Sequence, residues 1–324
     1  RKADGVTSKP VTDATKVFAM DYGNASSTSS IATYDSGFPV DFSIRRQPAT
    51  SQSWYAGSRL TGTKSVTTDT NVAEVNDNNL TWDRNDGVGK WSGDLSSYLM
   101  WQWKRHAGFE CISYIGNGTA GRQLTHHLSK TPEMIFMKNR DETANWIAWH
   151  KGLNGGTNSE KYYLRLNTND AEIYLPDLGA ATTLLFNDTA PTSTVVTLGD
   201  SGNLNKNGYN HIMMLFASVE NISKVGSYTG NGNAMNSNPL TITTGFQPRF
   251  ILIKLASDET HKKDWNVFDS VRGLGSGNDP RLALNSDGTG DSYDFVEVTS
   301  TGFKVNNWTD VGASGYEYIY YAHA

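Results

Sequence analysis

The chain has little cysteine, little charge and no long apolar run. Its 324 residues include one cysteine, Cys111, which excludes an intramolecular disulfide and any zinc site built mainly from cysteine. Charged residues make up 19% and the formal net charge is −5, so there is no basic stripe of the kind that binds nucleic acid. No apolar run approaches the roughly 18 residues of a membrane-spanning helix. We therefore expect neither a nucleic-acid partner nor membrane insertion, and we expect Cys111 to be a small buried hydrophobe.

Helical patterns are also missing. No segment shows a sustained helical period with caps at its ends. Hydrophobic residues make up only 37%, and the deficit is filled by Ser, Thr, Asn and 31 Gly. The 9 Trp, 15 Tyr and 12 Phe are too many for a solvated, disordered chain. This composition is typical of many short strands joined by polar turns.

The clearest feature present is a repeat. An aromatic, strand-like segment closes three successive stretches of the chain, at residues 97–103, 208–217 and 315–322. A tryptophan strand precedes each one, at Trp54, Trp146 and Trp265. From a preceding proline to that tryptophan the spacing is 15, 14 and 17 residues, and from the tryptophan to the closing tyrosine it is 44, 63 and 51. A nearly fixed early spacing followed by a variable one is typical of a shared scaffold with variable loops.

The repeat predicts the fold class and the domains. We expect an all-β chain of three tandem antiparallel β-sandwich modules of the jelly-roll, lectin-like kind, each with about seven short strands. The predicted boundaries are an N-terminal arm or linker at 1–15, then modules at 16–106, 107–222 and 223–324. Each module is large enough to bury its own core. A propeller is the alternative repeat architecture, but its blades are about half this length.

Alternation in the last strand assigns its faces. One face carries Tyr316, Tyr318 and Tyr320, and the other carries Glu317, Ile319 and Tyr321. Only Glu317 is charged, so both faces should be covered. We expect a central strand of a sandwich, with its second face against a neighbouring module or subunit.

The motifs resemble a repeat found in virion proteins of tailed phages, especially marine and cyanobacterial ones. The third module carries them best, in the segments 228–232, 245–248, 265–273, 282–285 and 315–322. The second module keeps the skeleton but has His150-Lys151-Gly152-Leu153 where the third has Asp269-Ser270-Val271-Arg272-Gly273. The resemblance covers roughly residues 16–324 and implies sandwiches of the concanavalin-like, laminin-G-like group.

What the resemblance implies for function is a structural virion protein, located on the tail or capsid surface. It would be a tail-fibre, appendage or decoration component whose partners are other virion proteins and host-surface polysaccharide. A tandem array would give reach, and a homo-oligomer, with a trimer as the first guess, would give avidity. One alternative is a purely architectural spacer or docking protein. A second is a polysaccharide-degrading tailspike, although we expect no enzyme.

The residues themselves point to no catalytic or metal site, and no cofactor is expected. Nothing in the sequence brings a glycosidase carboxylate pair to a cleft. Asp269 and Arg272 are expected to make a structural contact. The segment 285–291 has oxygen ligands at alternate positions like a calcium loop, but it begins with Asn and lacks the closing Glu, so a turn is preferred.

Loop tryptophans are the candidates for sugar binding. Trp54, Trp146 and Trp265 recur at equivalent places and are expected to be core anchors. Trp91 and Trp308 instead lie in loops before a closing strand, close to Asn and Asp. A flat apolar face beside hydrogen-bonding side chains can bind a sugar, whereas the alternative is that both residues cap the end of a sandwich. The candidate glycan-binding residues are Trp91, Asp94, Asn306, Asn307, Trp308 and Asp310.

Overall fold

The computed structural model describes residues 11–25, 32–77, 80–90, 93–275 and 277–324. The chain is all-β and its paired strands are antiparallel, which confirms the predicted fold class. The helical pieces are short: η1 (Ala14–Lys16), η2 (Leu153–Gly156), η3 (Ser159–Lys161), η4 (Leu175–Leu178) and α1 (Gly202–Asn205).

Three six-stranded sheets with the same strand order form the scaffold. The first contains, in spatial order, β1 (Phe18–Tyr22), β9 (Leu99–Trp103), β3 (Phe42–Arg46), β4 (Tyr55–Ser58), β5 (Lys64–Thr67) and β6 (Val75–Asn76). The second contains β10 (Phe109–Ile115), β17 (Asn210–Phe216), β12 (Met134–Asn139), β13 (Ile147–His150), β14 (Tyr162–Arg165) and β15 (Ile173–Tyr174). The third contains β18 (Ser223–Thr229), β26 (Glu317–His323), β20 (Phe250–Leu255), β21 (Asn266–Asp269), β22 (Asp279–Ala283) and β23 (Asp291–Tyr293).

A smaller sheet accompanies each large one. These sheets are β2 (Tyr34–Asp35), β8 (Gly87–Lys90) and β7 (Leu80–Thr81); then β11 (Arg122–Thr125) and β16 (Val195–Leu198); then β19 (Leu240–Thr243), β25 (Gly302–Val305) and β24 (Val296–Thr299). We call β1–β9, β10–β17 and β18–β26 the first, second and third modules. Their described parts hold nine, eight and nine strands instead of about seven, because several strands are only two residues long and show no period. The residues at which the modules begin and end stay a prediction.

The two faces of each large sheet have different neighbours. In the third module, Tyr318 and Tyr320 of β26 pack with Ile242 and Phe303 of the small sheet. On the other face, Ile319 and Tyr321 belong to a second cluster. The last strand is therefore central and covered on both sides, as its alternation predicts.

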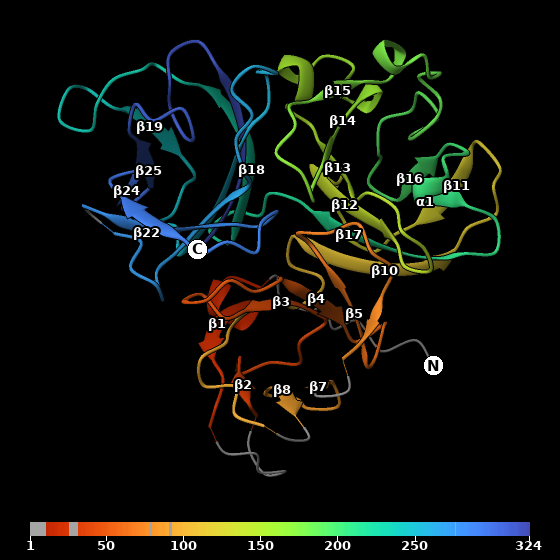
Figure 1. Cartoon of the computed structure of the whole chain (residues 1–324), viewed down its shortest axis with the longest axis horizontal. Helices are drawn as coiled ribbons and strands as arrows, with labels where there is room; N and C mark the ends of the chain where they lie inside the picture. Colours follow the sequence, from red (N-terminus) through yellow and green to blue (C-terminus); the bar gives the residue numbers. More distant parts are fainter. Residues whose placement is uncertain (1–10, 26–31, 78–79, 91–92, 276) are drawn as a thin grey trace.

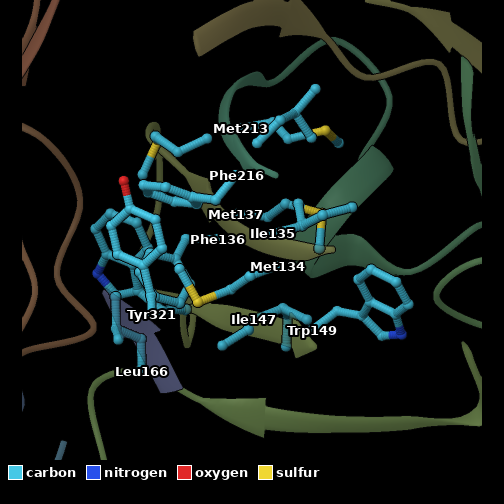
Figure 2. Close-up of a cluster of buried hydrophobic side chains, with 14 of the residues drawn as sticks. Met134, Ile135, Phe136, Met137, Ile147, Trp149, Leu166, Met213, Phe216 and Tyr321 are labelled. Carbon is cyan, nitrogen blue, oxygen red and sulfur yellow. The ribbon is translucent and has the colours of Figure 1, made fainter. Parts of the chain in front are cut away.

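That second cluster is shared by all three modules. Phe42 lies 5.6 Å from Phe109, Phe18 lies 5.5 Å from Phe250, and Phe216 lies 5.0 Å from Tyr321, measured between ring centroids. Figure 1 shows the three modules as lobes around one centre, and Figure 2 shows Phe216 beside Tyr321. The expectation that each module buries its own core is thus incomplete, because the inner sheet faces are apolar and cover one another. The expectation that the tandem modules give the chain a long reach is wrong, since the modules pack in a ring and not in a line (Figure 1).

The recurring tryptophans close this ring. Each is buried, as predicted, and its indole N–H donates to the last residue of the fifth strand of a neighbouring sheet. The bonds run from Trp54 to the carbonyl of Ala283 at 2.8 Å, from Trp146 to that of Thr67 at 2.8 Å, and from Trp265 to that of Arg165 at 3.1 Å. The direction is the same each time, so the first module bonds to the third, the second to the first, and the third to the second.

Three buried cations repeat the same cycle. Arg46, Lys138 and Lys254 hold equivalent register positions, opposite Leu99, Ile212 and Ile319, and all are fully buried. Lys138 donates to the carbonyl of Asn71 in the first module, and Lys254 donates to that of Asn169 in the second. Arg46 donates to the carbonyls of Ser286, Asp287 and Gly288 in the third. The oxygen-rich segment 285–291 therefore holds a guanidinium with its main chain.

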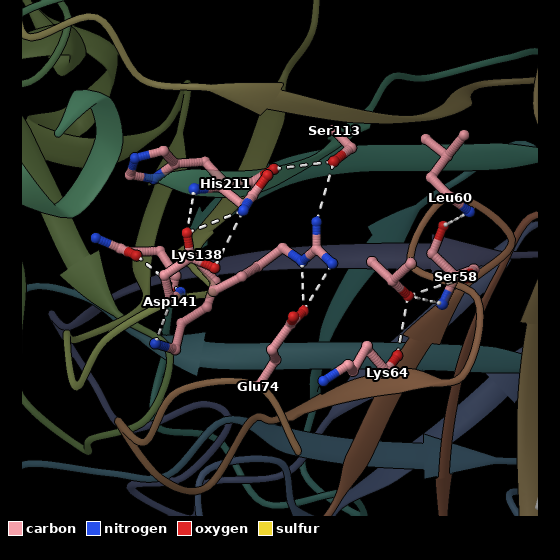
Figure 3. A network of polar contacts seen from close by, with 12 residues as sticks. Ser58, Leu60, Lys64, Glu74, Ser113, Lys138, Asp141 and His211 are labelled. Atoms are coloured by element: carbon pink, nitrogen blue, oxygen red, sulfur yellow. Dashed lines mark hydrogen bonds and ion pairs between the residues drawn. The ribbon is translucent and has the colours of Figure 1, made fainter. Parts of the chain in front are cut away.

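Polar side chains add to the boundary between the first and second modules. Arg140 forms an ion pair with Glu74 at 2.7 Å and donates to Ser113 Oγ at 3.2 Å (Figure 3). Both charged side chains are largely buried. Such a pair fixes how the two modules meet more than it adds net stability, because burial costs both ions their hydration.

Two glycines explain why the pattern Tyr-x-Gly-Asn-Gly occurs both at 114–118 and at 228–232. A Cβ at Gly116 would lie 2.1 Å from the carbonyl oxygen of Lys206, and one at Gly230 would lie 2.1 Å from that of Ala313. Backbone approaches the strand end so closely in both modules that no side chain fits.

Strand pairing corrects one detail of the sequence register. Phe42, Met134 and Phe250 each pair with the last aromatic of the neighbouring strand, at Trp103, Phe216 and His323. Counting back from these positions, Val40 and not Pro39 is equivalent to Pro132 and Pro248. The three early spacings to the tryptophan are then 14, 14 and 17 residues, so the first two modules agree fully.

Two further predicted contacts are confirmed. Arg272 Nε donates to Asp269 Oδ2 at 2.6 Å, with both side chains buried. Cys111 is a buried free thiol, and burial raises its pKa to about 12.

The segment that enters the first large sheet, the two junctions between modules and the end of the last strand meet in one small cluster. Ala14 and Val17 near the start pack with Ala107 and Ile222, which lie just before the second and third sheets, and Ala324 packs against them. The segment that leaves each closing strand bonds back to the segment that enters the same sheet. These bonds are Lys104 N to Val17 O, Ala217 N to Gly108 O, and Ala324 N to Ile222 O.

Candidate functional site

Four of the six predicted glycan-binding residues lie in one loop between β25 and β26. Trp308 is 43% exposed, and its indole N–H donates to the carbonyl of Asp294 at 3.0 Å. Its ring centroid lies 5.5 Å from that of Tyr293 and 5.9 Å from that of Phe295. The indole is therefore fixed in place but open to solvent on part of its surface.

Tyr293 at the end of β23 completes an exposed pair, which we call the aromatic ledge (Tyr293 and Trp308). Tyr293 is 50% exposed, and its ring is tilted 41° to that of Trp308. Buried Phe295 supports both rings from below and itself packs against Phe268 of β21 at 5.7 Å. A ledge with such support keeps its shape without a ligand.

Asn306 holds the loop together. It is buried, and its Nδ2 donates to the carbonyl and the carboxylate of Asp294. Its Oδ1 accepts from the backbone N–H groups of Met235 and Asn307. These bonds occupy the Asn306 amide. The pKa of Asp294 is raised by burial and, to a smaller extent, by the negative charge of Glu297.

Asp310 anchors the base of the same loop. Its carboxylate forms ion pairs with Arg281 and Lys263, and Arg281 also pairs with Asp291 of β23. The Arg281 guanidinium lies 4.7 Å from the centre of the Phe295 ring. Asp310 thus ties the loop to the strand that carries Tyr293.

Asn307 is the polar residue that the loop leaves open. It is exposed, and within the described residues its side-chain amide has no hydrogen-bond partner. It directly precedes Trp308. A ring face next to a free amide can stack on the apolar face of a sugar and bond to its hydroxyl groups.

The remaining two candidates belong to the first module. Asp94 is exposed and accepts hydrogen bonds from the Oγ and backbone N–H of Ser96, which lower the pKa of Asp94. Trp91 lies outside the described residues. The structure therefore places Asp94 in a different lobe from the ledge (Figure 1).

Sequence reasoning missed Tyr293. Its partner Trp308 is 15 residues away, across β24 and β25, and no local pattern links the two. The signal that could have found it is the alternation Ser292-Tyr293-Asp294-Phe295, which gives two aromatic residues two positions apart.

Among known families, residues 52–324 match the one described as "Domain of unknown function (DUF7483)". The chain belongs to this family. The matched span of DUF7483 contains all three ring tryptophans and the whole aromatic ledge. It also takes in strands from all three large sheets, as expected for modules that share one core.

Among curated proteins, none matches the chain. In the described part of this DUF7483 member, no helix is long and apolar enough to cross a membrane. The same part contains no group of three or more His, Cys, Asp and Glu side chains placed to hold a metal ion.

Proposed function

We propose that this DUF7483 protein is a structural component of a tailed-phage virion, in a tail fibre, appendage or surface decoration, and that its aromatic ledge contacts host-surface glycan. The virion setting rests on the resemblance of the repeated motifs. The glycan contact rests on the ledge itself.

The observation that carries the glycan contact is the exposure of two supported aromatic rings beside a free amide. Single exposed apolar side chains are normal on a protein surface, whereas neighbouring exposed rings that form one apolar patch can mark a contact site. Tyr293 and Trp308 are exposed although Phe295 beneath them is fully enclosed. Tyr and Trp are also the residues that contribute most often to binding energy at interfaces.

A glycan array on the purified protein tests this proposal. We expect binding to a set of surface glycans, and the double substitution Tyr293→Ala/Trp308→Ala should weaken it by about tenfold or more. The matched control is Tyr22→Ala, since Tyr22 is 39% exposed in another module and should leave binding unchanged. A glycan-binding profile that the double substitution leaves unchanged would refute the ledge as the contact site.

The purely architectural alternative is favoured by the closed ring. The cyclic tryptophan and cation contacts hold the three modules together as one body, as a rigid spacer or docking element requires. Absence of any glycan binding would support this role. Assembly of several chains into a homo-oligomer, with a trimer as the first guess, stays a prediction, although one chain already arranges three modules about a centre.

The polysaccharide-degrading alternative requires a carboxylate pair in a cleft. Glu133 and Glu160 do line one cleft in the second module. However, Glu133 pairs with Lys151 and accepts from the backbone N–H of Ser218, and these contacts lower its pKa despite its burial. A general acid needs a raised pKa. Release of reducing ends from the glycans bound on the array would favour the enzyme nonetheless.

A further inference from the structure

The second module contains a cleft that none of the predicted residues lines. Its volume is about 570 Å³, within the range of about 300–1,000 Å³ that is typical of small-molecule sites. The segment just before β12, the end of β13 and the segment around η3 form its walls, together with Ala190, Pro191 and the residues that follow β17.

One wall of the cleft departs from the repeat. Lys130 stands four residues before Met134, where the first and third modules have Phe38 and Phe246. Both phenylalanines are buried in the cores of their sandwiches, whereas Lys130 is exposed and lines the cleft. The phenylalanine that fills this place in the first and third modules is thus absent from the second.

The other departures of the second module meet at the same cleft. Lys151 lines it, and Lys151 belongs to the stretch that replaces Asp269–Gly273 of the third module. Ala190 and Pro191 come from residues 169–200, a long insertion of the second module. An ion pair between Lys161 and Asp188 at 3.3 Å holds this insertion beside η3. Three independent changes to a repeated scaffold therefore converge on one cavity, which is unexpected if the cavity has no role.

One residue that lines the cleft carries a buried donor without a partner. Trp149 of β13 is only 3% exposed, and within the described residues its indole Nε1 has no hydrogen-bond acceptor. Figure 2 shows the Trp149 nitrogen turned away from Met134 and Ile147 of the core. Buried N–H groups almost always have a partner, because leaving one unpaired is costly. An acceptor in the cleft would satisfy it.

The rim supplies further uncommitted groups of both kinds. In the described part of the chain, the side chains of Lys130, Asn158 and Glu160 form no hydrogen bond or ion pair. Lys130 donates, Glu160 accepts and the Asn158 amide does both. The two lysines and two glutamates that line the cleft balance in charge.

We propose that this cleft binds a short neutral saccharide, with Trp149 Nε1–H donating to a sugar oxygen. A sugar hydroxyl both donates and accepts, and so matches a rim of mixed donors and acceptors without net charge. The site is separate from the aromatic ledge, and it does not depend on the ledge or on the virion setting.

The test follows the indole N–H signal of Trp149 by ¹H–¹⁵N NMR on the full chain, with Trp149→Phe used to assign it. The probes are N-acetylglucosamine, galactose and maltotriose as neutral sugars, and galacturonate and inorganic phosphate as anions. We expect at least one neutral sugar to shift the Trp149 signal saturably. No shift with any neutral sugar, or saturable shifts with the anions alone, would overturn the proposal.

Two substitutions at Lys130 distinguish a specific loss of sugar binding in the cleft from a general loss of stability. Lys130→Phe introduces the residue of the other modules and should abolish the Trp149 shift while leaving the thermal midpoint unchanged or higher. Lys130→Ala keeps the cleft open and should weaken sugar binding only by a few-fold. An equal loss of sugar binding in both variants would refute the idea that Lys130→Phe acts by filling the cleft.

The two sugar sites can fail independently. The Tyr293→Ala/Trp308→Ala protein should lose the array glycans that the ledge binds and still show the Trp149 shift. Retention of the shift without any array binding would remove the ledge proposal alone, and loss of the shift in this double variant would contradict a separate cleft site.

Discussion

The centre of the ring and its rim are built by different rules. At the centre, the three modules use the same kinds of residues in the same places: one tryptophan and one buried cation each, all directed to a neighbouring main chain. At the rim the modules differ. The third has the aromatic ledge, and the second has an open cleft where its neighbours have a buried phenylalanine.

This difference between centre and rim indicates where binding sites can arise. A contact that recurs in a cycle constrains all three copies at once, because each central residue must fit another module. A rim residue meets only its own module and can change freely. We therefore expect central substitutions to change stability, and rim substitutions to change binding.

The largest expected effect is at a central tryptophan. Trp265→Ala should lower the free energy of unfolding by about 3–5 kcal/mol, because it removes a buried ring and the indole hydrogen bond to the carbonyl of Arg165. Trp308→Ala, at the rim, should cost about 1 kcal/mol or less. Urea denaturation followed by circular dichroism measures both. Equal losses would remove the distinction between centre and rim.

A second prediction concerns acid. His323 is buried and stacks on Phe18 at 4.5 Å, and burial lowers its pKa to about 3. The unfolded histidine binds a proton near pH 6.5, so the folded state holds fewer protons and the free energy of unfolding falls below that pH, by up to about 1.4 kcal/mol per pH unit. His323→Phe, which copies Phe216 of the second module, should remove this share.

We compare the free energy of unfolding of the His323→Phe protein with that of the wild type at two pH values. The difference between the two proteins should shift in favour of the variant by about 2–3 kcal/mol from pH 7.5 to pH 4.5. Urea midpoints across this range test it. His150, also buried with a pKa near 3, keeps its own acid dependence in both proteins and serves as an internal reference. Parallel stability curves for the two proteins would contradict the assignment.

The smallest effect is expected in alkali. Burial lowers the pKa of Lys254 to about 7, whereas the unfolded lysine titrates near 10.5. Between these values the folded state holds fewer protons, so the free energy of unfolding should rise from pH 7.5 to 9 by up to about 2 kcal/mol. Lys254→Met should flatten this rise.

Lys138→Met is the matched variant for this prediction. Burial lowers the pKa of Lys138 only to about 8, so its substitution should flatten the rise less than Lys254→Met does. An unchanged rise in the Lys254→Met protein, or a larger effect of Lys138→Met, would show that Lys254 is not the dominant group.

Sequence reasoning reached the central residues but not their partners. Recurrence marked Trp54, Trp146 and Trp265 as core anchors, and burial confirms this. Equal spacing along a chain, however, does not distinguish modules in a line from modules in a ring. The acceptor of each indole lies 79 to 229 residues away, and no local pattern connects such positions.

At the rim the limit is different. Trp308 could be predicted as a loop tryptophan, but Asn306 and Asp310 beside it looked the same as Asn307 in sequence. Only tertiary contacts separate a buried amide with four bonds and a carboxylate in ion pairs from a free amide. Lys130 was overlooked because a surface lysine is unremarkable until strand register aligns it with Phe38 and Phe246.

The cluster of Ala14, Ala107, Ile222 and Ala324 means that the order of the modules along the chain could change without a change in how the modules pack. Since the segments that enter all three large sheets meet there beside Ala324, a short linker could join residue 324 to residue 14 while a new opening is cut near residue 107 or 222. The ring contacts, which are cyclic, would be the same in such a circular permutant.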